Sequence, residues 1–180
     1  MTSPGPVLLD ACVLVPMPLA DTLLRLAAVG MFEPKWTRGI INEVNRTLAD
    51  KFGLTPGQVE RREGALKRHF ASAWIEGHEN LVASMTNHPG DRHVLAAAVH
   101  SGTSVIVTAN LRHFPAAALA AHGVESRSPG AFLLDLYRDQ PQPVLACLMD
   151  QANVIGVPLA YLLKRLEVNA PEFVAGLGSY

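Results

Sequence analysis

Apolar residues in the first part of the chain form short uninterrupted runs, which are typical of strands buried in a parallel sheet. Residues 6–10 are such a run and end in an acid, Asp10. Residues 103–108 are β-branched and predict a central buried strand. Residues 31–36 predict a brief strand, and residues 124–126 predict a strand at the edge of the sheet.

Between these runs, apolar residues recur at helical spacing and are bounded by residues that start or stop helices. Thr37 is a candidate N-cap for a helix that Gly53 would stop, and Thr55-Pro56 would begin another. Residues 71–88 show no clear pattern. The predicted helices cover residues 18–30, 37–50, 55–70, 93–100 and 115–121.

From Pro129 onward every segment predicts a helix, over residues 130–138, 143–154 and 158–166 and in a short turn after Pro171. Strands that alternate with helices indicate an α/β domain built on a parallel sheet. We therefore expect one α/β domain over residues 1–128 and an all-helical extension over residues 129–180, packed on the same domain.

Composition narrows the class of protein. Hydrophobic residues make up 49% of the 180 residues, which excludes a disordered chain. No apolar run approaches the ~20 residues of a membrane span, and the first residues lack the features of a signal peptide, so we expect a cytoplasmic protein without a membrane segment. Cys12 and Cys147 have no metal-binding spacing and are expected to be buried thiols.

Charge is unevenly distributed along the chain. Residues 35–68 carry eight Lys/Arg and four acids, a net charge of +4, whereas the net charge of the whole chain is −1. A basic segment on an acidic body could meet a phosphate backbone, and a solvated helix face would give the same pattern.

Two candidate site residues follow predicted strands. Asp10 ends the first strand, and Thr108-Ala109-Asn110 lies at the carboxyl end of the strand over residues 103–108. Ligands of open parallel sheets bind beyond the carboxyl ends of the strands, so both segments could present oxygen atoms at that edge. Alternatively, Asp10 caps the following turn, and Asn110 is a turn-forming residue.

Two further acids lie on predicted helices. Glu43 borders an apolar helix face and could point into a cleft, or be an ordinary exposed acid. Asp91 follows Pro89-Gly90 in the first turn of a helix, where the helix dipole keeps a carboxylate ionised; this placement suits a metal ligand or a helix-stabilising acid. Arg92 could be a phosphate clamp or a surface charge, and we expect His93 to be packed.

Together these residues predict a metal site. Carboxylates gathered at one edge repel each other unless a cation is present, and oxygen ligands favour Mg²⁺ or Mn²⁺ over zinc. Such an ion can activate water for attack on a phosphodiester. This chemistry requires no nucleophilic side chain.

Four segments of the sequence resemble motifs of PIN-domain proteins, and in particular of the VapC-type toxins of bacterial toxin–antitoxin pairs. They occur in the family's order over about residues 5–128. They are Val7-Leu8-Leu9-Asp10-Ala11-Cys12-Val13-Leu14, Ile41-Asn42-Glu43-Val44-Asn45-Arg46-Thr47-Leu48, Gly90-Asp91-Arg92-His93-Val94-Leu95-Ala96-Ala97-Ala98 and Val105-Ile106-Val107-Thr108-Ala109-Asn110-Leu111-Arg112-His113-Phe114.

The resemblance implies a Rossmann-like PIN fold, Mg²⁺- or Mn²⁺-dependent cleavage of RNA, and inhibition by a small cognate antitoxin protein. It makes Asp10, Glu43 and Asp91 the catalytic and metal-binding acids. Thr108, Asn110, Arg92 and His113 become auxiliary residues, with Asn110 as a weaker metal ligand.

The sequence departs from the family at Asn110 and His113, where PIN proteins commonly carry Asp. The departure leaves a second hypothesis open, a PIN-fold module that binds RNA or protein and cleaves weakly or not at all. A haloacid-dehalogenase-type phosphatase would need an Asp at position 12, and a dinucleotide-binding protein would need a Gly-x-Gly-x-x-Gly motif. Apolar surface in the helical extension would suit a homodimer or an antitoxin groove.

Overall fold

A five-stranded parallel sheet forms the centre of the protein. The computed structural model describes residues 5–178. The strands lie in the order β3-β2-β1-β4-β5, and every neighbouring pair is parallel. Their bounds are β1 Pro6–Leu9, β2 Glu33–Thr37, β3 Trp74–Ile75, β4 Val105–Val107 and β5 Glu125–Arg127.

This strand order places the point at which the chain connections change direction between β1 and β4. The chain builds β1, β2 and β3 outward in one direction, then returns to place β4 on the other side of β1. Leu8 pairs with Lys35 of β2 and with Ile106 of β4, so β1 is the middle strand. Connections that leave two neighbouring strands in opposite directions open a crevice at their carboxyl ends, where ligands of such sheets bind.

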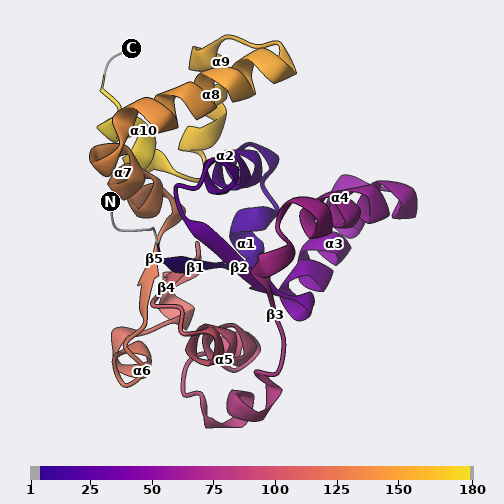
Figure 1. Ribbon diagram of the computed structural model, residues 1–180, viewed down its shortest axis with the longest axis vertical. Coiled ribbons are helices and arrows are strands. Elements are labelled where there is room, and N and C mark those ends of the chain that lie inside the picture. The colour runs from indigo at the N-terminus through magenta and orange to yellow at the C-terminus, as the bar shows by residue number, and fades with distance from the viewer. Residues whose placement is uncertain (1–4, 179–180) are drawn as a thin grey trace.

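Helices cover both faces of the sheet (Figure 1). In this view α5 and α6 lie on one side of the strands, α1 and α2 lie on the other, and the α3–α4 pair extends away from the body. The bounds are α1 Ala11–Leu14, α2 Met17–Ala28, α3 Arg38–Phe52, α4 Pro56–His69, α5 Arg92–Ser101 and α6 Ala116–Ala120. Short 3₁₀ turns are η1 Ala71–Ala73, η2 Glu79–Ser84, η3 Pro89–Asp91 and η4 Leu111–His113.

The ends of α3 and α4 follow directly from the sequence. Thr37 caps α3 by accepting a hydrogen bond from the main chain of Ile40, and Gly53 ends the helix in the left-handed conformation. Thr55 and Gln58 form a reciprocal capping box at the start of α4.

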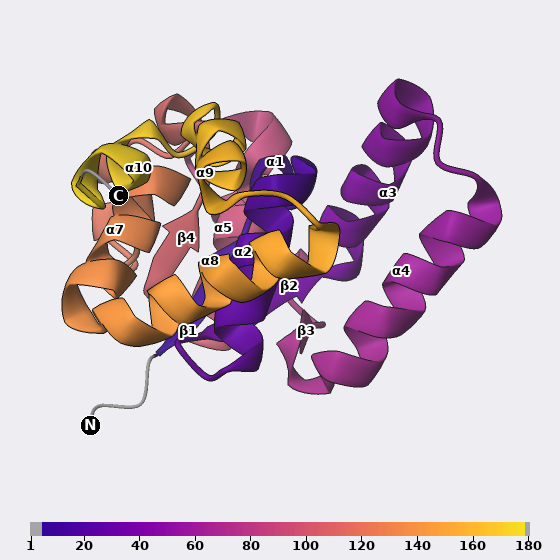
Figure 2. The same ribbon diagram turned by 90° about the horizontal axis from the view of Figure 1, so that it is seen from above.

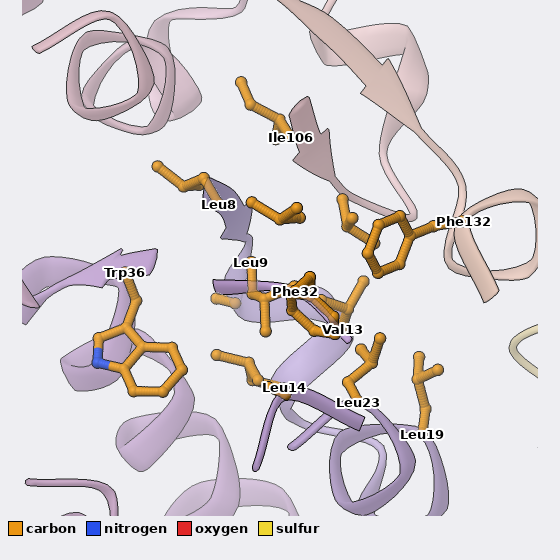
Figure 3. Packing of buried hydrophobic residues seen from close by; sticks show 14 of the residues in the cluster. Leu8, Leu9, Val13, Leu14, Leu19, Leu23, Phe32, Trp36, Ile106 and Phe132 are labelled. Carbon is orange, nitrogen blue, oxygen red and sulfur yellow. The ribbon is translucent and has the colours of Figure 1, made fainter. Parts of the chain in front are cut away.

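The hydrophobic core is built on the sheet by buried side chains of α1–α3, of α5 and of the C-terminal helices. Figure 3 shows Leu8 and Leu9 of β1 beside Ile106 of β4, with Leu14 of α1 and Trp36 of β2 around them. These side chains are almost completely buried. The core therefore fixes the ends of β1 and β4, from which the candidate site projects.

Four helices make up the C-terminal extension, α7 Pro129–Asp139, α8 Pro141–Ile155, α9 Leu159–Glu167 and α10 Pro171–Gly176. In Figure 2, α8 crosses over α2. Gln151 of α8 accepts a hydrogen bond from Thr22 Oγ1 at 2.7 Å and donates one to the carbonyl of Pro18 at 3.0 Å. The extension thus packs on the body through buried polar contacts as well as apolar ones.

Within residues 5–178, no single helix has the length and apolar character to cross a membrane. Helices α8 and α9 reach that length and composition only as a pair, and the pair is bent by 105°. Both helices bury apolar side chains in this fold, Leu148 from α8 and Leu162 and Leu166 from α9.

The predicted α/β architecture with a helical extension is confirmed. Most elements occupy the predicted segments, but the sheet contains a strand, β3, that the sequence pattern did not reveal. This strand has two residues, too few to show alternation. The strand predicted over residues 103–108 is confirmed as a buried interior strand, β4, which lies between β1 and β5.

Candidate active site

Asp10 lies at the carboxyl end of β1 and is 4% exposed. Its Oδ1 accepts a hydrogen bond of 2.7 Å from the main chain of Ala11, so it caps α1. Its Oδ2 accepts a hydrogen bond of 2.7 Å from Thr108 Oγ1. The two sequence interpretations of Asp10, a cap and a carboxylate at the strand edge, are therefore compatible.

Thr108 is fully buried directly after β4, and its hydroxyl donates a hydrogen bond to Asp10 rather than facing solvent. Its hydroxyl oxygen also accepts a hydrogen bond from the main chain of Asn110 at 3.0 Å. One hydroxyl thus connects the end of β1 to the turn after β4.

Cys12 completes this network. Its Sγ lies 3.3 Å from Asp10 Oδ2, and it accepts a hydrogen bond of 3.2 Å from the main chain of Ala109. Burial, with a smaller contribution from the negative charge of Asp10, raises the pKa of the Cys12 thiol to about 12. The thiol is therefore protonated at neutral pH and has no nucleophilic role.

Glu43 projects from α3, and its pKa depends on the charges of the other two acids. The pKa of Glu43 is raised above its ordinary value, first by partial burial and then by the negative charge of Asp10. Asp91 raises it further, while the nearby His93 lowers it. The pKa of Glu43 therefore responds to the charges of both Asp10 and Asp91, although the ligand atoms of these three described residues do not form a group within 4.8 Å.

Asp91 holds the N-cap position of α5, one residue before the first turn in which it was predicted. Its carboxylate caps no main-chain N–H of the helix. Instead, Asp91 Oδ2 lies 2.6 Å from Nδ1 of His113 and 3.5 Å from Nδ1 of His88. Asp91 therefore makes no capping hydrogen bond, although its charge still lies at the N-terminus of α5, where it can stabilise the helix.

The remaining auxiliary residues lie around the same loops. Asn110 and Arg92 are half-buried, and Arg92 Nε makes a long hydrogen bond of 3.4 Å to the carbonyl of Asn87. The side chain of Asn87 in turn donates to the carbonyl of Asp91 at 3.0 Å, which fixes the turn that precedes α5.

Part of the basic charge in residues 35–68 is paired or turned inward within the protein. Glu63 of α4 contacts Arg38 and also lies 2.9 Å from Lys67 Nζ. The pKa of Glu63 is lowered mainly by the hydrogen bond from Lys67 and also by Arg38. Arg62 is turned inward to the carbonyl of Leu14 at 3.1 Å. Arg38, Lys67 and Arg62 are therefore less free to meet a phosphate than the sequence alone suggests.

Sequence reasoning missed three residues of this neighbourhood. Cys12 was expected to be only a buried thiol, His93 only a packed side chain, and His88 was not considered. A signal for His88 exists in retrospect, because it lies three residues before Asp91, but a single His in a loop is not distinctive.

The donors at this edge fit a divalent cation. Asp10 is buried and oriented by two hydrogen bonds, and the pKa of Glu43 is raised first by partial burial and then by the charges of Asp10 and Asp91. A cation placed among them would relieve that repulsion, and carboxylate oxygens suit Mg²⁺ or Mn²⁺.

Comparisons with known proteins agree with this arrangement. Residues 6–112, more than half of the chain, match the family model described as PIN domain. Over 111 residues the chain is 40% identical to a Mycobacterium tuberculosis protein named "Putative ribonuclease VapC50". The alignment covers 59% of this chain and 64% of that protein, which is less than two thirds of the relative's own length.

Proposed function

Since this chain belongs to the PIN-domain family, we propose that it is a metal-dependent endoribonuclease that hydrolyses phosphodiester bonds of RNA. The observation that carries the proposal is the hydrogen bond that joins the carboxyl ends of β1 and β4. Thr108 orients the buried carboxylate of Asp10 there, and the negative charges of Asp10 and Asp91 contribute to the raised pKa of Glu43.

In this proposal Asp10, Glu43 and Asp91 hold Mg²⁺ or Mn²⁺. The bound ion supplies a Lewis acid for the phosphate and lowers the pKa of water. Asp10 contributes a carboxylate whose orientation is set by Thr108 and the main chain of Ala11. Such outer partners fix the direction of a ligand and so set the affinity of the site.

The other residues of the site would orient Asp10 or bind the RNA and the ion. Thr108 is a positioning residue, because its hydroxyl is buried and directed at Asp10. Arg92, at the first position of α5, would attract an RNA phosphate, and Asn110 would offer an amide to the substrate or an oxygen to the ion.

The name of the mycobacterial relative supports a finer proposal, that the protein is the toxin of a VapBC-type pair. A small antitoxin would then bind and inhibit it, and RNA cleavage would take place in the cytoplasm. The exposed apolar side chains of the extension, which include Met149, Val154 and Ile155 of α8, offer surface for an antitoxin or a second copy of the chain.

Replacement of Asp10 or Asp91 by Asn tests the nuclease proposal. Each variant keeps the side-chain shape and removes a charge, so we expect cleavage of a single-stranded RNA to fall by at least about 100-fold, the loss typical when a stabilising transition-state contact is removed. Asp50→Asn, on the exposed end of α3, is the matched control and should cleave like the unmodified protein. Full activity of both folded site variants would refute the proposal.

One observation favours the alternative of a module that binds RNA or protein without cutting. His113 stands where PIN proteins commonly carry Asp, and its imidazole engages one oxygen of Asp91. A binding-only protein would have lost its affinity for hard cations, so calorimetric titration with Mn²⁺ separates the two. Binding of Mn²⁺ that depends on Asp10 supports the nuclease, and RNA binding without it supports the alternative.

A further inference from the structure

A second group of metal-ligating side chains is built around Asp91 by the loops that precede α5 and follow β4. Ligand atoms of His88, Asp91 and His113 all lie within 4.8 Å of one another. His88 precedes η3, Asp91 ends η3, and His113 ends η4. The main-chain N–H of His88 donates to the carbonyl of His113 at 3.1 Å, which ties the two loops together.

The two imidazole rings are arranged around one carboxylate oxygen. They stack with centroids 4.1 Å apart and planes 12° apart. Asp91 Oδ2 lies 2.6 Å from Nδ1 of His113 and 3.5 Å from Nδ1 of His88. The Nδ1 atoms of both rings therefore lie near the same carboxylate oxygen, and one of the two nearly parallel rings has to turn before both nitrogens can face one ion.

These separations suit a tetrahedral ion. Bonds of roughly 2.0–2.1 Å to nitrogen or oxygen place two ligand atoms of a tetrahedral zinc ion about 3.4 Å apart. The distance between His88 and Asp91 already has this value within 0.1 Å, since it is 3.5 Å. The closer contact of His113 has to open by less than 1 Å, from 2.6 Å.

An ion has access to the cluster. The side chain of His88 is 50% exposed, and those of His113 and Asp91 are 22% and 18% exposed. The half-exposed ring of His88 can turn to present either nitrogen, although Nδ1 now accepts a hydrogen bond of 3.2 Å from the main chain of Gly90. Water can complete the coordination.

From this geometry we propose that His88, Asp91 and His113 form a second cation site, one that binds a zinc-class transition metal. Imidazole nitrogen favours Zn²⁺, Co²⁺ or Ni²⁺, whereas Mg²⁺ prefers oxygen alone. The site shares Asp91 with the proposed nuclease centre but does not depend on cleavage. A cation position that favours oxygen ligands and a second position that favours nitrogen ligands would therefore share the carboxylate of Asp91.

Titration of the metal-free full-length protein with Co²⁺ tests this site, because Co²⁺ bound to nitrogen and oxygen in low coordination absorbs visible light strongly. We expect His88→Gln and His113→Asn to weaken Co²⁺ binding by at least about tenfold, and Zn²⁺ to displace Co²⁺ in the unmodified protein. Excess Mg²⁺ should not displace it. His122→Gln, on an exposed residue outside the cluster, should bind Co²⁺ like the unmodified protein.

The outcomes separate this site from the proposed nuclease centre. Asp10→Asn should lose RNA cleavage and keep the Co²⁺ spectrum. Co²⁺ binding that survives in both His variants, or that disappears in Asp10→Asn alone, would overturn the second site and leave the nuclease proposal standing. Thermal unfolding verifies that each variant is folded, and ring proton resonances of His88 and His113 that do not move with Zn²⁺ would also overturn it.

Discussion

Thr108 Oγ1 lies 2.7 Å from Asp10 Oδ2, and this hydrogen bond joins residues 98 positions apart in the sequence. It connects the ends of β1 and β4, the two strands between which the connections of the sheet change direction. The direction of the Asp10 carboxylate is therefore set by a neighbouring strand as well as by its own.

Thr108→Val removes this hydroxyl and keeps the shape of the side chain. Because the Asp10 carboxylate loses one of its two orienting donors, we expect Mn²⁺ affinity to fall by about 10- to 100-fold. Calorimetric titration measures the change. Thr108→Ser restores the hydroxyl and should recover most of the affinity; equal loss in the Val and Ser variants would mean that packing, and not the hydrogen bond, matters at this position.

Glu43→Gln should change how stability depends on pH. The pKa of Glu43 in the folded protein is raised above 4.5, mainly by partial burial, so its contribution to stability is complete below 4.5 and is lost as pH rises through the raised value. The metal-free Gln variant should therefore be more stable than the unmodified protein at neutral pH, by a few tenths of a kcal/mol because the residue is exposed and screened.

Urea unfolding at pH 4 and pH 7 measures this difference. Glu60→Gln, on an exposed position of α4, is the matched control and should not alter the pH dependence. A Glu43→Gln variant that is less stable than the unmodified protein at neutral pH without metal would contradict the prediction.

Metal should stabilise the folded protein through the proposed acidic centre. A ligand that binds only the folded state adds about 2.7 kcal/mol when its free concentration is 100 times Kd. We expect Mn²⁺ to raise the melting temperature of the unmodified protein and a chelator to reverse the increase. Asp10→Asn should show little of this effect; an equal increase in that variant would place the stabilising ion elsewhere.

The buried contacts of Gln151 should hold the helical extension on the body. Gln151→Ala leaves the hydroxyl of Thr22 without its partner in α8, and it removes the bond to the carbonyl of Pro18. We expect a loss of about 1–3 kcal/mol in the free energy of unfolding. Asp150→Ala, next to it on the exposed side, removes only a surface ion pair with Arg25 and should cost about 1 kcal/mol or less.

The same unfolding experiment tests whether residues 1–128 and 129–180 form one domain. A single transition that shifts as a whole in Gln151→Ala is expected if the two parts unfold together. Two separate transitions, with only one of them altered, would show that the extension is an independent unit.

The sequence predicted the elements whose signals are local. Thr37 and Gly53 mark the ends of α3, and Thr55 begins α4, because capping depends only on neighbouring residues. Strand β3 was missed because two residues, Trp74 and Ile75, are recognised only by their pairing with β2. Pairing between distant segments is set by the packed fold and leaves little trace in a short segment.

The same distinction applies to the candidate site. Asp10 could be placed at the edge of the sheet because it ends an apolar run. The contact of Asp91 with His113 could not be predicted, because it depends on how the loops before α5 and after β4 approach each other. The contact of Cys12 with Asp10 likewise arises from the first turn of α1 and not from any metal-binding spacing.

Glu63 has a consequence for how the protein would meet a polyanion. Its single carboxylate contacts both Arg38 and Lys67, so the three side chains together present a net charge of +1 to an approaching nucleic acid strand. The salt dependence of binding to a phosphate backbone grows with the number of phosphates that a protein neutralises. Contact made through Arg38 and Lys67 would consequently depend less on ionic strength than two unpaired cations would.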